Sequence, residues 1–403
     1  MRIIPTHMAK PGMRLGRAIY DPQGRLVIAA GVTLQPRLLS LLERQGFSAV
    51  YVADEFGDVD VPELVSLETK QEVMRCVRDF VQLESMHAER LSLASGPGYL
   101  GLQQQSGFMI SKARHEISLN VMKVAEMLVN DIMSQKEVII GLVDIKSLHD
   151  YSFGHSVQVA MNSLVTARIM GFNNKELRDL GGGALLHDIG KTAIPNSIWA
   201  KPGDLTIEEF TRVRDHPQAG FETLRKTDLG LMAAHIAYQH HERWDGSGYP
   251  RRLSGGNILK HARICAVCDV FDAMTSDRPY KKAAHPLEGL AFIAENAGIL
   301  FDPEVVEAFS KIVAPFPVAT SVILSTGETA IVRRLNPRAL DRPVVVITKD
   351  AAGNFYSVPR TVDLQSQVSL RISSYADWYS APDHSQIMAA SGLIVEAVNK
   401  ATQ

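Results

Sequence analysis

Apolar residues recur every three to four positions through the middle of the chain. Such spacing lines one face of successive amphipathic helices, so residues 113–314 are predicted to form an all-helical domain. Thr206 and Glu209 have the spacing of a capping box, and Pro303 stands where a first-turn proline belongs. The predicted helices are 113–134, 155–170, 175–190, 206–215, 228–241, 259–275, 287–297 and 303–313.

The start of the chain shows a different pattern, in which short β-like runs alternate with turn signals. The runs at 18–20, 26–29 and 49–52 are separated by turn residues and by one helical stretch at 36–45. This pattern predicts a small α+β module over residues 1–61.

Residues 62–112 connect this module to the helical domain. A charged helical pattern runs to residue 91, and a Gly/Ser/Gln-rich stretch without apolar periodicity follows at 92–107. That composition is typical of a flexible linker. The apolar residues of the charged helix do not hold a clean heptad, so pairing between subunits and a solvated connecting helix both fit it.

Beyond residue 314 the chain turns to β-branched runs at 318–324, 329–332 and 344–348. Such runs are typical of strands, so residues 315–403 are predicted to form a β-rich appendage. The fold class is therefore mainly α, with an all-helical domain between a small α+β domain and a β-rich C-terminal appendage.

Composition and charge narrow the function. The 403 residues include 42 Lys and Arg against 44 Asp and Glu, so no global positive field attracts duplex nucleic acid, and a phosphate-bearing ligand must be held locally. The longest apolar run, Val138 to Val143, is six residues long, whereas a membrane span needs roughly 18. Three cysteines and the absence of a signal-peptide pattern favour a reducing, cytoplasmic location.

Histidines are concentrated in the helical domain, where eight of the chain's 13 lie between residues 149 and 261. Some of them stand beside acidic residues, and Asp269 adds a carboxylate to a strongly apolar helix. Imidazoles and carboxylates are common metal ligands. The candidate ligands are His155, His187, Asp188, His216, His240, His241 and Asp269.

The adjacent pairs in this set point to more than one metal ion. Neighbouring residues on a helix project about 100° apart, so His187 and Asp188 cannot offer equivalent bonds to one ion. A carboxylate has two oxygens and can span two cations, which makes Asp188 the natural bridge. If the helix persists, Lys191 shares this face and its ammonium stands near the metals, available to a phosphate oxygen.

Other residues of these types have a plainer interpretation. His149, His235 and His261 are each typical of hydrogen-bonded core histidines. The pair Cys265 and Cys268 lacks a second such pair and lies on a predicted helix, so buried small residues are favoured over a zinc or redox site.

Three extended motifs carry a family resemblance: HDIGK at 187–191, HHERWDGSGYP at 240–250 and DVFDAMTSDRPYK at 269–281. Because it contains these motifs, the stretch from about His149 to Lys282 resembles the HD-GYP domain. This domain is a branch of the HD phosphohydrolase superfamily, and members of the branch hydrolyse cyclic di-GMP. The opening IPTHMAKPGMRLG is similar to an uncharacterised domain that is often fused in front of such phosphodiesterases.

The resemblance implies a role for each candidate residue. His155, His187, Asp188 and Asp269 would hold one metal, and Asp188 would bridge to a second metal held by His216, His240 and His241. Lys191 would contact the scissile phosphate. Gly248, Tyr249 and Pro250 would lie beside the substrate pocket, and Arg278 and Lys281 would bind the phosphates of the cyclic dinucleotide.

The types of candidate ligand predict which metals bind, and one difference from the family predicts how many. Histidine and carboxylate ligands without thiolates suit iron or manganese best, while nickel and zinc also fit. Some family members carry a glutamate, associated with a third metal, where this chain has Tyr151. We therefore expect two divalent metal ions.

The implied activity is metal-dependent hydrolysis of cyclic di-GMP to linear pGpG, GMP or both. The alternatives are a receptor that binds cyclic di-GMP without cleaving it, a phosphodiesterase for cyclic GMP-AMP or the linear dinucleotide, and a scaffold with structural metals. The N-terminal module shows no cofactor motif, and we expect it to bind a signalling partner or form a homodimer.

Overall fold

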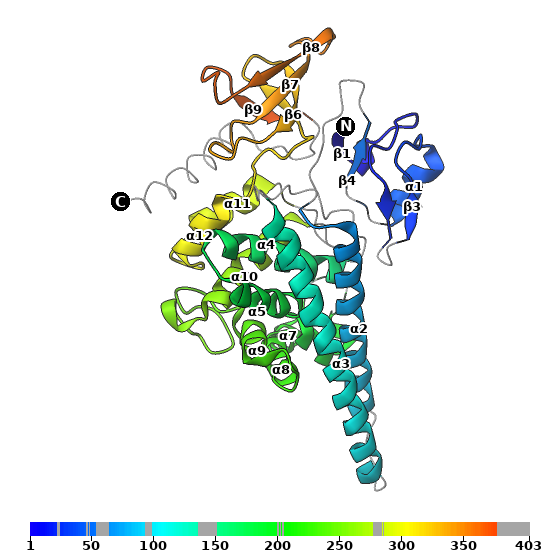
Figure 1. Cartoon of the computed structure of the whole chain (residues 1–403), viewed down its shortest axis with the longest axis vertical. Coiled ribbons are helices and arrows are strands. Elements are labelled where there is room, and N and C mark those ends of the chain that lie inside the picture. Colours follow the sequence, from blue (N-terminus) through cyan, green and yellow to red (C-terminus); the bar gives the residue numbers. More distant parts are fainter. Residues whose placement is uncertain are drawn as a thin grey trace.

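The computed structural model describes residues 1–21, 25–45, 47, 49–53, 64–92, 99–135, 151–199, 201, 203, 205–276, 284 and 286–376. Figure 1 shows a helical domain, with a long pair of helices along one side and two small β-containing modules at one end. The predicted fold class, mainly α with a β-rich C-terminal appendage, is confirmed. None of the helices in the described part of the chain is long and apolar enough to cross a membrane.

Nine α-helices and two short 3-10 turns make up the described body that follows the helix pair. The α-helices are α4 (Tyr151–Ile169), α5 (Asn174–Leu185), α6 (Asn196–Trp199), α7 (Ile207–Val213), α8 (His216–Leu224), α9 (Gly230–Gln239), α10 (Lys260–Thr275), α11 (Pro286–Glu295) and α12 (Pro303–Ser310). The short 3-10 turns described in the chain are η1 (Thr6–Met8), η2 (Ile189–Ala193) and η3 (Gly255–Asn257).

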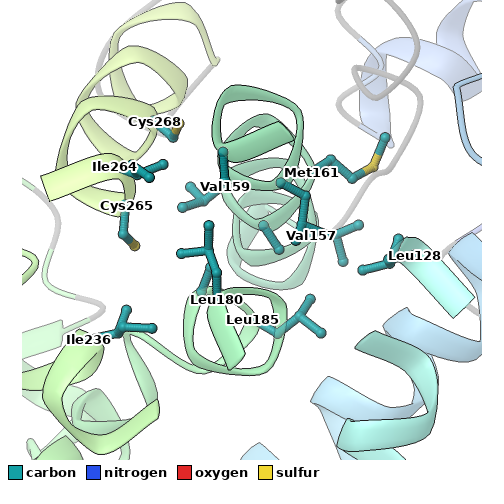
Figure 2. Close-up of a cluster of buried hydrophobic side chains, with 14 of the residues drawn as sticks. Leu128, Val157, Val159, Met161, Leu180, Leu185, Ile236, Ile264, Cys265 and Cys268 are labelled. Atoms are coloured by element: carbon teal, nitrogen blue, oxygen red, sulfur yellow. The ribbon is translucent and has the colours of Figure 1, made fainter. Parts of the chain in front are cut away.

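The core of this domain is formed by α4 and the helices around it. Figure 2 shows Val157 and Met161 of α4 among side chains from α3, α5, α9 and α10. Cys265 and Cys268 of α10 belong to the same core and form no disulfide. Their interpretation as buried small residues is confirmed, and burial raises the pKa of both thiols.

Capping residues set the helix ends. The predicted capping box of Thr206 and Glu209 is present at the start of α7, and Pro303 occupies the first turn of α12. Two predicted helices were too long. α5 ends at Leu185 and α9 at Gln239, so the motif residues that follow them lie in turns.

The helix pair is α2 (Leu67–Ser92) and α3 (Tyr99–Ser134), which run side by side (Figure 1). The prediction of a flexible linker over 92–107 is wrong from residue 99 onward, where α3 is already helical. Composition is a weak guide when neighbouring residues on the same helix bury an apolar face, and α3 buries Val121, Leu128 and Ile132 further along.

α2 is also part of the domain core. Val73, Met74, Val77 and Phe80 are buried in the same cluster as α4 and α5. Across the pair, Arg114 donates two hydrogen bonds to Glu84, at 2.7 and 2.6 Å. The interpretation of this segment as a solvated connecting helix is therefore wrong, because its apolar face packs within the chain.

The N-terminal module contains two small antiparallel sheets and one helix. β1 (Arg2–Pro5) pairs with β4 (Ala49–Val52), β2 (Ile19–Tyr20) pairs with β3 (Leu26–Ile28), and α1 (Pro36–Arg44) packs beside them. The predicted α+β character is confirmed, although β1 was missed from the sequence.

The C-terminal appendage is a five-stranded antiparallel sheet in the order β8-β7-β6-β5-β9. Its strands are β5 (Ser321–Leu324), β6 (Thr329–Arg334), β7 (Val344–Lys349), β8 (Phe355–Asp363) and β9 (Ile372–Tyr375). The sheet touches the N-terminal module, because the amide of Ile3 donates to the carbonyl of Ala319 at 2.9 Å. Ile3 and Tyr51 pack there against Ile331. The domain boundaries drawn from the sequence stay predictions.

The packing of α2 gives a stability prediction. Phe80→Ala removes a fully buried ring and should lower the free energy of unfolding by about 3–5 kcal/mol. Met86→Ala, on the same helix but 48% exposed, should change it by less than about 0.5 kcal/mol. Urea unfolding of both variants checks this, and equal small effects would show that α2 does not contribute to the core.

Candidate metal centre

All seven predicted ligands meet at one place, and most of them lie at helix ends. His155 comes from α4 and Asp269 from α10, while His187 and Asp188 occupy the turn after α5. His216 is the first residue of α8, and the pair His240 and His241 follows the last residue of α9. The candidate ligands therefore come from five helices or from the residues that directly follow them.

The first group of ligand atoms comprises His155, His187 and Asp188, whose donor atoms all lie within 4.8 Å of one another. Asp269 lies beside them, with Oδ1 at 3.2 Å from Nε2 of His155 and 3.9 Å from Nε2 of His187. Oδ2 of Asp188 lies 3.5 Å from Nε2 of His187. This group has the size and composition of a metal site.

The second group comprises Asp188, His216, His240 and His241, again with donor atoms within 4.8 Å of one another. Oδ1 of Asp188 lies 3.4 Å from Nε2 of His216 and 3.7 Å from Nε2 of His240. The two oxygens of Asp188 therefore face different groups of imidazoles. A carboxylate placed in this way can be shared by two cations.

Backbone carbonyls hold three of the imidazoles. In each case Nδ1 donates to the carbonyl three residues earlier, at the end of a helix where such carbonyls have no intrahelical partner. With Nδ1 protonated, Nε2 presents its lone pair to the cluster. The pairs are His187 with Ala184 at 2.8 Å, His216 with Val213 at 2.7 Å and His240 with Ala237 at 2.9 Å.

The donors fit divalent cations. Nε2 of His187 is fully buried and has no hydrogen-bond partner within the described residues. Nε2 of His216 and Nε2 of His240 lie 3.3 Å apart, and because both Nδ1 atoms already donate, two lone pairs face each other. Buried acceptors in this state are costly, and a cation would satisfy them.

Asp272 is a site residue that the sequence interpretation missed. Its Oδ2 lies 2.7 Å from Nδ1 of His155, and its side chain is buried. Asp272 is three residues after Asp269 on α10, so one helix face carries both carboxylates. The Asp-x-x-Asp spacing was the available signal. A carboxylate behind a histidine orients the ring and makes it a stronger ligand.

Burial and charge set the protonation states. Burial lowers the pKa of His187 to about 4 and that of His216 to about 3. Burial would also lower the pKa of His155, but its hydrogen bonds to Asp269 and Asp272 outweigh this and raise it to about 10. Without metal, His155 is therefore cationic at neutral pH.

Both cluster carboxylates are ionised. Burial would raise the pKa of Asp188, but the charges of Lys191 and then His187 hold it well below its usual range. Burial would also raise the pKa of Asp269, but the hydrogen bond with His155 outweighs this effect and holds the pKa well below its usual range.

Lys191 reaches the cluster from a turn and not from the predicted helix. η2 begins directly after Asp188, and the Lys191 ammonium forms an ion pair with the Asp188 carboxylate. Gly190 lets this turn approach α8, because an added Cβ would lie 1.9 Å from the carbonyl oxygen of His216. The local structure differs from the prediction, but the side chain lies where it was expected.

The loop that contains Gly248, Tyr249 and Pro250 is tied to the cluster. The Tyr249 ring stacks on the His241 ring, with 4.8 Å between centroids. Buried Glu242 accepts hydrogen bonds from the amides of Arg251 at 2.8 Å and Leu253 at 3.0 Å, which fixes the loop. An added Cβ at Gly248 would meet backbone atoms at about 2.4 Å.

Comparison with known proteins places this geometry in a family. Residues 138–305 match the family model described as HD domain. This part of the chain is an HD domain. The match spans the cluster from His155 to Asp269, and the resemblance to the HD-GYP branch is confirmed by the relatives that the chain matches.

Three of these relatives are informative. The chain is 38% identical over 238 residues to a cyclic di-GMP phosphodiesterase of Pseudomonas aeruginosa. The aligned stretch covers 59% of this chain and 56% of that protein. It is 45% identical over 149 residues to a cyclic di-GMP phosphodiesterase response regulator of Xanthomonas campestris, covering 36% and 39%. It is 38% identical over 170 residues to a 3′3′-cGAMP-specific phosphodiesterase of Vibrio cholerae, covering 42% and 36%. The chain thus spans at most 56% of the length of these relatives.

Five further predicted residues of the HD domain are not part of the two ligand groups that the structure describes. Arg278, Lys281 and His149 lie outside the described residues. His261 is buried against Phe172 and His235 lies beside Phe221, both outside the two ligand groups. Their interpretation as core residues agrees with these positions, but the expected hydrogen bonds are not found among the described residues for either ring nitrogen of His261 or for Nδ1 of His235.

The hydrogen bond behind His155 gives the first prediction for this site. Asp272→Asn keeps the side-chain shape but removes the negative charge that polarises the imidazole, so metal affinity should fall about 10- to 100-fold. Titration with Mn²⁺ measures this. Asp228→Asn, which changes an exposed carboxylate paired with His115, is the control and should bind metal like the unaltered protein.

The protonation states give a second prediction. His155 is the protonated ligand, with a pKa of about 10, whereas the pKa values of His187 and His216 lie at about 4 and 3. Metal binding between pH 7 and 9 should therefore release about one proton, and affinity should rise about tenfold per pH unit. Calorimetry in buffers with different ionisation enthalpies counts the protons, and a count of zero would contradict the assignment.

Proposed function

We propose that this chain is a metal-dependent phosphodiesterase that hydrolyses a cyclic dinucleotide. The observation that carries the proposal is the Asp188 carboxylate, whose two oxygens face two separate imidazole groups. The match to the HD domain family and the names of the relatives point to the same chemistry.

The ligands would hold two divalent ions in the arrangement expected from the sequence. His155, His187, Asp188 and Asp269 would hold the first ion, and Asp188, His216, His240 and His241 the second. When bound, such ions supply Lewis-acid stabilisation of phosphoryl charge and an activated water nucleophile. Iron or manganese suits this donor set best, and nickel and zinc are compatible with it.

The chain's own residues would complete the site. The Lys191 ammonium, now paired with Asp188, would donate to a non-bridging oxygen of the scissile phosphate and offset its negative charge. The imidazoles of His187, His216 and His240 would keep the site preorganised. Their Nδ1 hydrogen bonds to backbone carbonyls fix the orientation of each ring before substrate arrives. Tyr249, Gly248 and Pro250 would line the substrate side, and Arg278 and Lys281 are assigned to its phosphates by resemblance alone.

Cyclic di-GMP is the substrate we propose, with linear pGpG, GMP or both as products. Relatives named as cyclic di-GMP phosphodiesterases, at 38% to 45% identity, support it. A second candidate is cyclic GMP-AMP, which is favoured by the cGAMP-specific relative at 38% identity. A receptor that only binds the dinucleotide is disfavoured, because loss of activity would remove the need for a full set of seven ligands.

Purified protein tests the proposal directly. The protein is loaded with Fe²⁺ or Mn²⁺ under anaerobic conditions, given cyclic di-GMP or cyclic GMP-AMP, and the products are separated by chromatography. We expect faster turnover of cyclic di-GMP. Tight binding without any product would support the receptor, and preference for cyclic GMP-AMP would support the second candidate.

The shared carboxylate provides the matching variant. Asp188→Ala removes both of the oxygens that face the imidazole groups, so metal content should fall and turnover should be lost to the limit of detection. Elemental analysis and the same product assay measure the two effects. Full turnover with unchanged metal content would refute the role of Asp188.

A further inference from the structure

The ring of Tyr249 connects the second ligand group to the end of α7. The His241 ring stacks on it, with 4.8 Å between centroids and an interplanar angle of 26°. The guanidinium carbon of Arg214, the residue that caps the C-terminal end of α7, lies 4.5 Å from the centroid of the same ring. Arg214 is therefore held one aromatic ring away from a candidate metal ligand.

The Arg214 guanidinium has no polar partner among the described residues, where no hydrogen bond or ion pair involves its side chain. By contrast, Arg114 and Arg263 each form an ion pair with a buried carboxylate, that of Glu84 and that of Asp302. A guanidinium that stacks on an aromatic ring keeps its in-plane N–H donors available. Arg214 is only half-buried, so these donors can reach a ligand.

The helix that carries Arg214 also exposes an aromatic ring. None of the residues of α7 is buried, and Phe210 is 51% exposed. The amide of Arg214 donates to the carbonyl of Phe210 at 3.0 Å, so the helical geometry continues to Arg214. Residues four positions apart on a helix lie on the same face. Phe210 and Arg214 therefore share one face of α7, and this face borders Tyr249.

The position of α7 does not depend on either of these side chains. The capping box of Thr206 and Glu209 fixes the start of the helix, and Lys201 adds an ion pair with Glu209 at 2.6 Å. Within the described residues, no aromatic or cation contact involves the Phe210 ring. The fold thus leaves an apolar ring and an unpaired guanidinium side by side at the edge of the candidate site.

This combination suits a nucleobase better than a phosphate. Aromatic side chains stack on bases because every base has a π face, whereas a phosphate has none. The fork of a guanidinium can donate two hydrogen bonds to the O6 and N7 atoms of guanine. Adenine has an amino donor in place of O6, so the same fork would lose one bond and meet another donor. The pair therefore favours guanine.

We propose that Phe210 and Arg214 form a guanine subsite, in which Phe210 stacks on one base of the dinucleotide and Arg214 donates to its O6 and N7 atoms. The inference rests on the proposed function and deepens it, because it names residues that would select the base. The phosphates stay with Lys191, Arg278 and Lys281. Cyclic GMP-AMP would bind in the one orientation that places its guanine at this subsite.

Two cyclic dinucleotides that differ only in their bases test the subsite in the full chain loaded with Mn²⁺. The KM is measured for cyclic di-GMP, and cyclic di-AMP is added as a competitor to obtain its inhibition constant. Arg214→Ala should raise the KM about 5- to 150-fold, the range of a lost bidentate contact with guanine, and should change the inhibition constant little. Phe210→Ala removes a surface on which any base can stack and should raise both constants.

Arg212→Ala is the matched control, since Arg212 is an exposed arginine of the same helix and residues two positions apart do not share a face. It should leave both constants unchanged. A substrate without a base, bis(p-nitrophenyl) phosphate, provides the second control, because Arg214→Ala should keep its kcat/KM and the bound Mn²⁺.

Three results would overturn the subsite. Equal losses on cyclic di-GMP and bis(p-nitrophenyl) phosphate would show that Arg214 only positions Tyr249 and the metal ligands. Equal weakening of both cyclic dinucleotides by Arg214→Ala would assign the guanidinium to the phosphates that they share. An unchanged KM for cyclic di-GMP in Arg214→Ala would show that Arg214 does not contact the substrate.

The same assays separate the subsite from the proposed function. If the unaltered protein cleaves bis(p-nitrophenyl) phosphate but no cyclic dinucleotide, the proposed function fails, and the subsite fails with it. If it cleaves cyclic di-GMP and Arg214→Ala keeps the preference for guanine, only the subsite fails.

Discussion

One carboxylate shared between two sets of imidazoles organises the HD domain of this chain. Asp188 sends one oxygen toward His187 and the other toward His216 and His240. This arrangement brings lone pairs close together in a buried place, where without a cation they repel each other. The fold must therefore supply enough packing energy elsewhere to hold the ligands in place.

The helix ends provide that support. Each of His187, His216 and His240 is anchored on a carbonyl that a helix leaves without an intrahelical partner. Each ring is thus oriented by one hydrogen bond to the end of a helix. His155 is held differently, by the Asp272 carboxylate, and because its pKa is raised to about 10 it must lose a proton to bind a metal.

The parts outside the HD domain are connected to it by packing. α2 contributes Phe80 to the domain core and joins α3 through the Arg114 and Glu84 pair. The C-terminal sheet includes Leu287 of α11 in its own core, and it also contacts the N-terminal module through Ile3. The N-terminal module is therefore connected to α11 by packing through the C-terminal sheet.

Local features of the sequence determined the fold class, most helices, the set of candidate ligands that lie together and the buried state of Cys265 and Cys268. Periodicity, capping and residue chemistry are carried by neighbours in the chain. The sequence misplaced the end of α5 and the start of α3, where packing of distant apolar residues outweighs local composition. Only the tertiary structure decided that His155 has Asp272 behind it, that the Tyr249 ring contacts His241 and Arg214, and that α2 belongs to the core. These contacts join residues far apart in the chain, and no local pattern records which of them will meet.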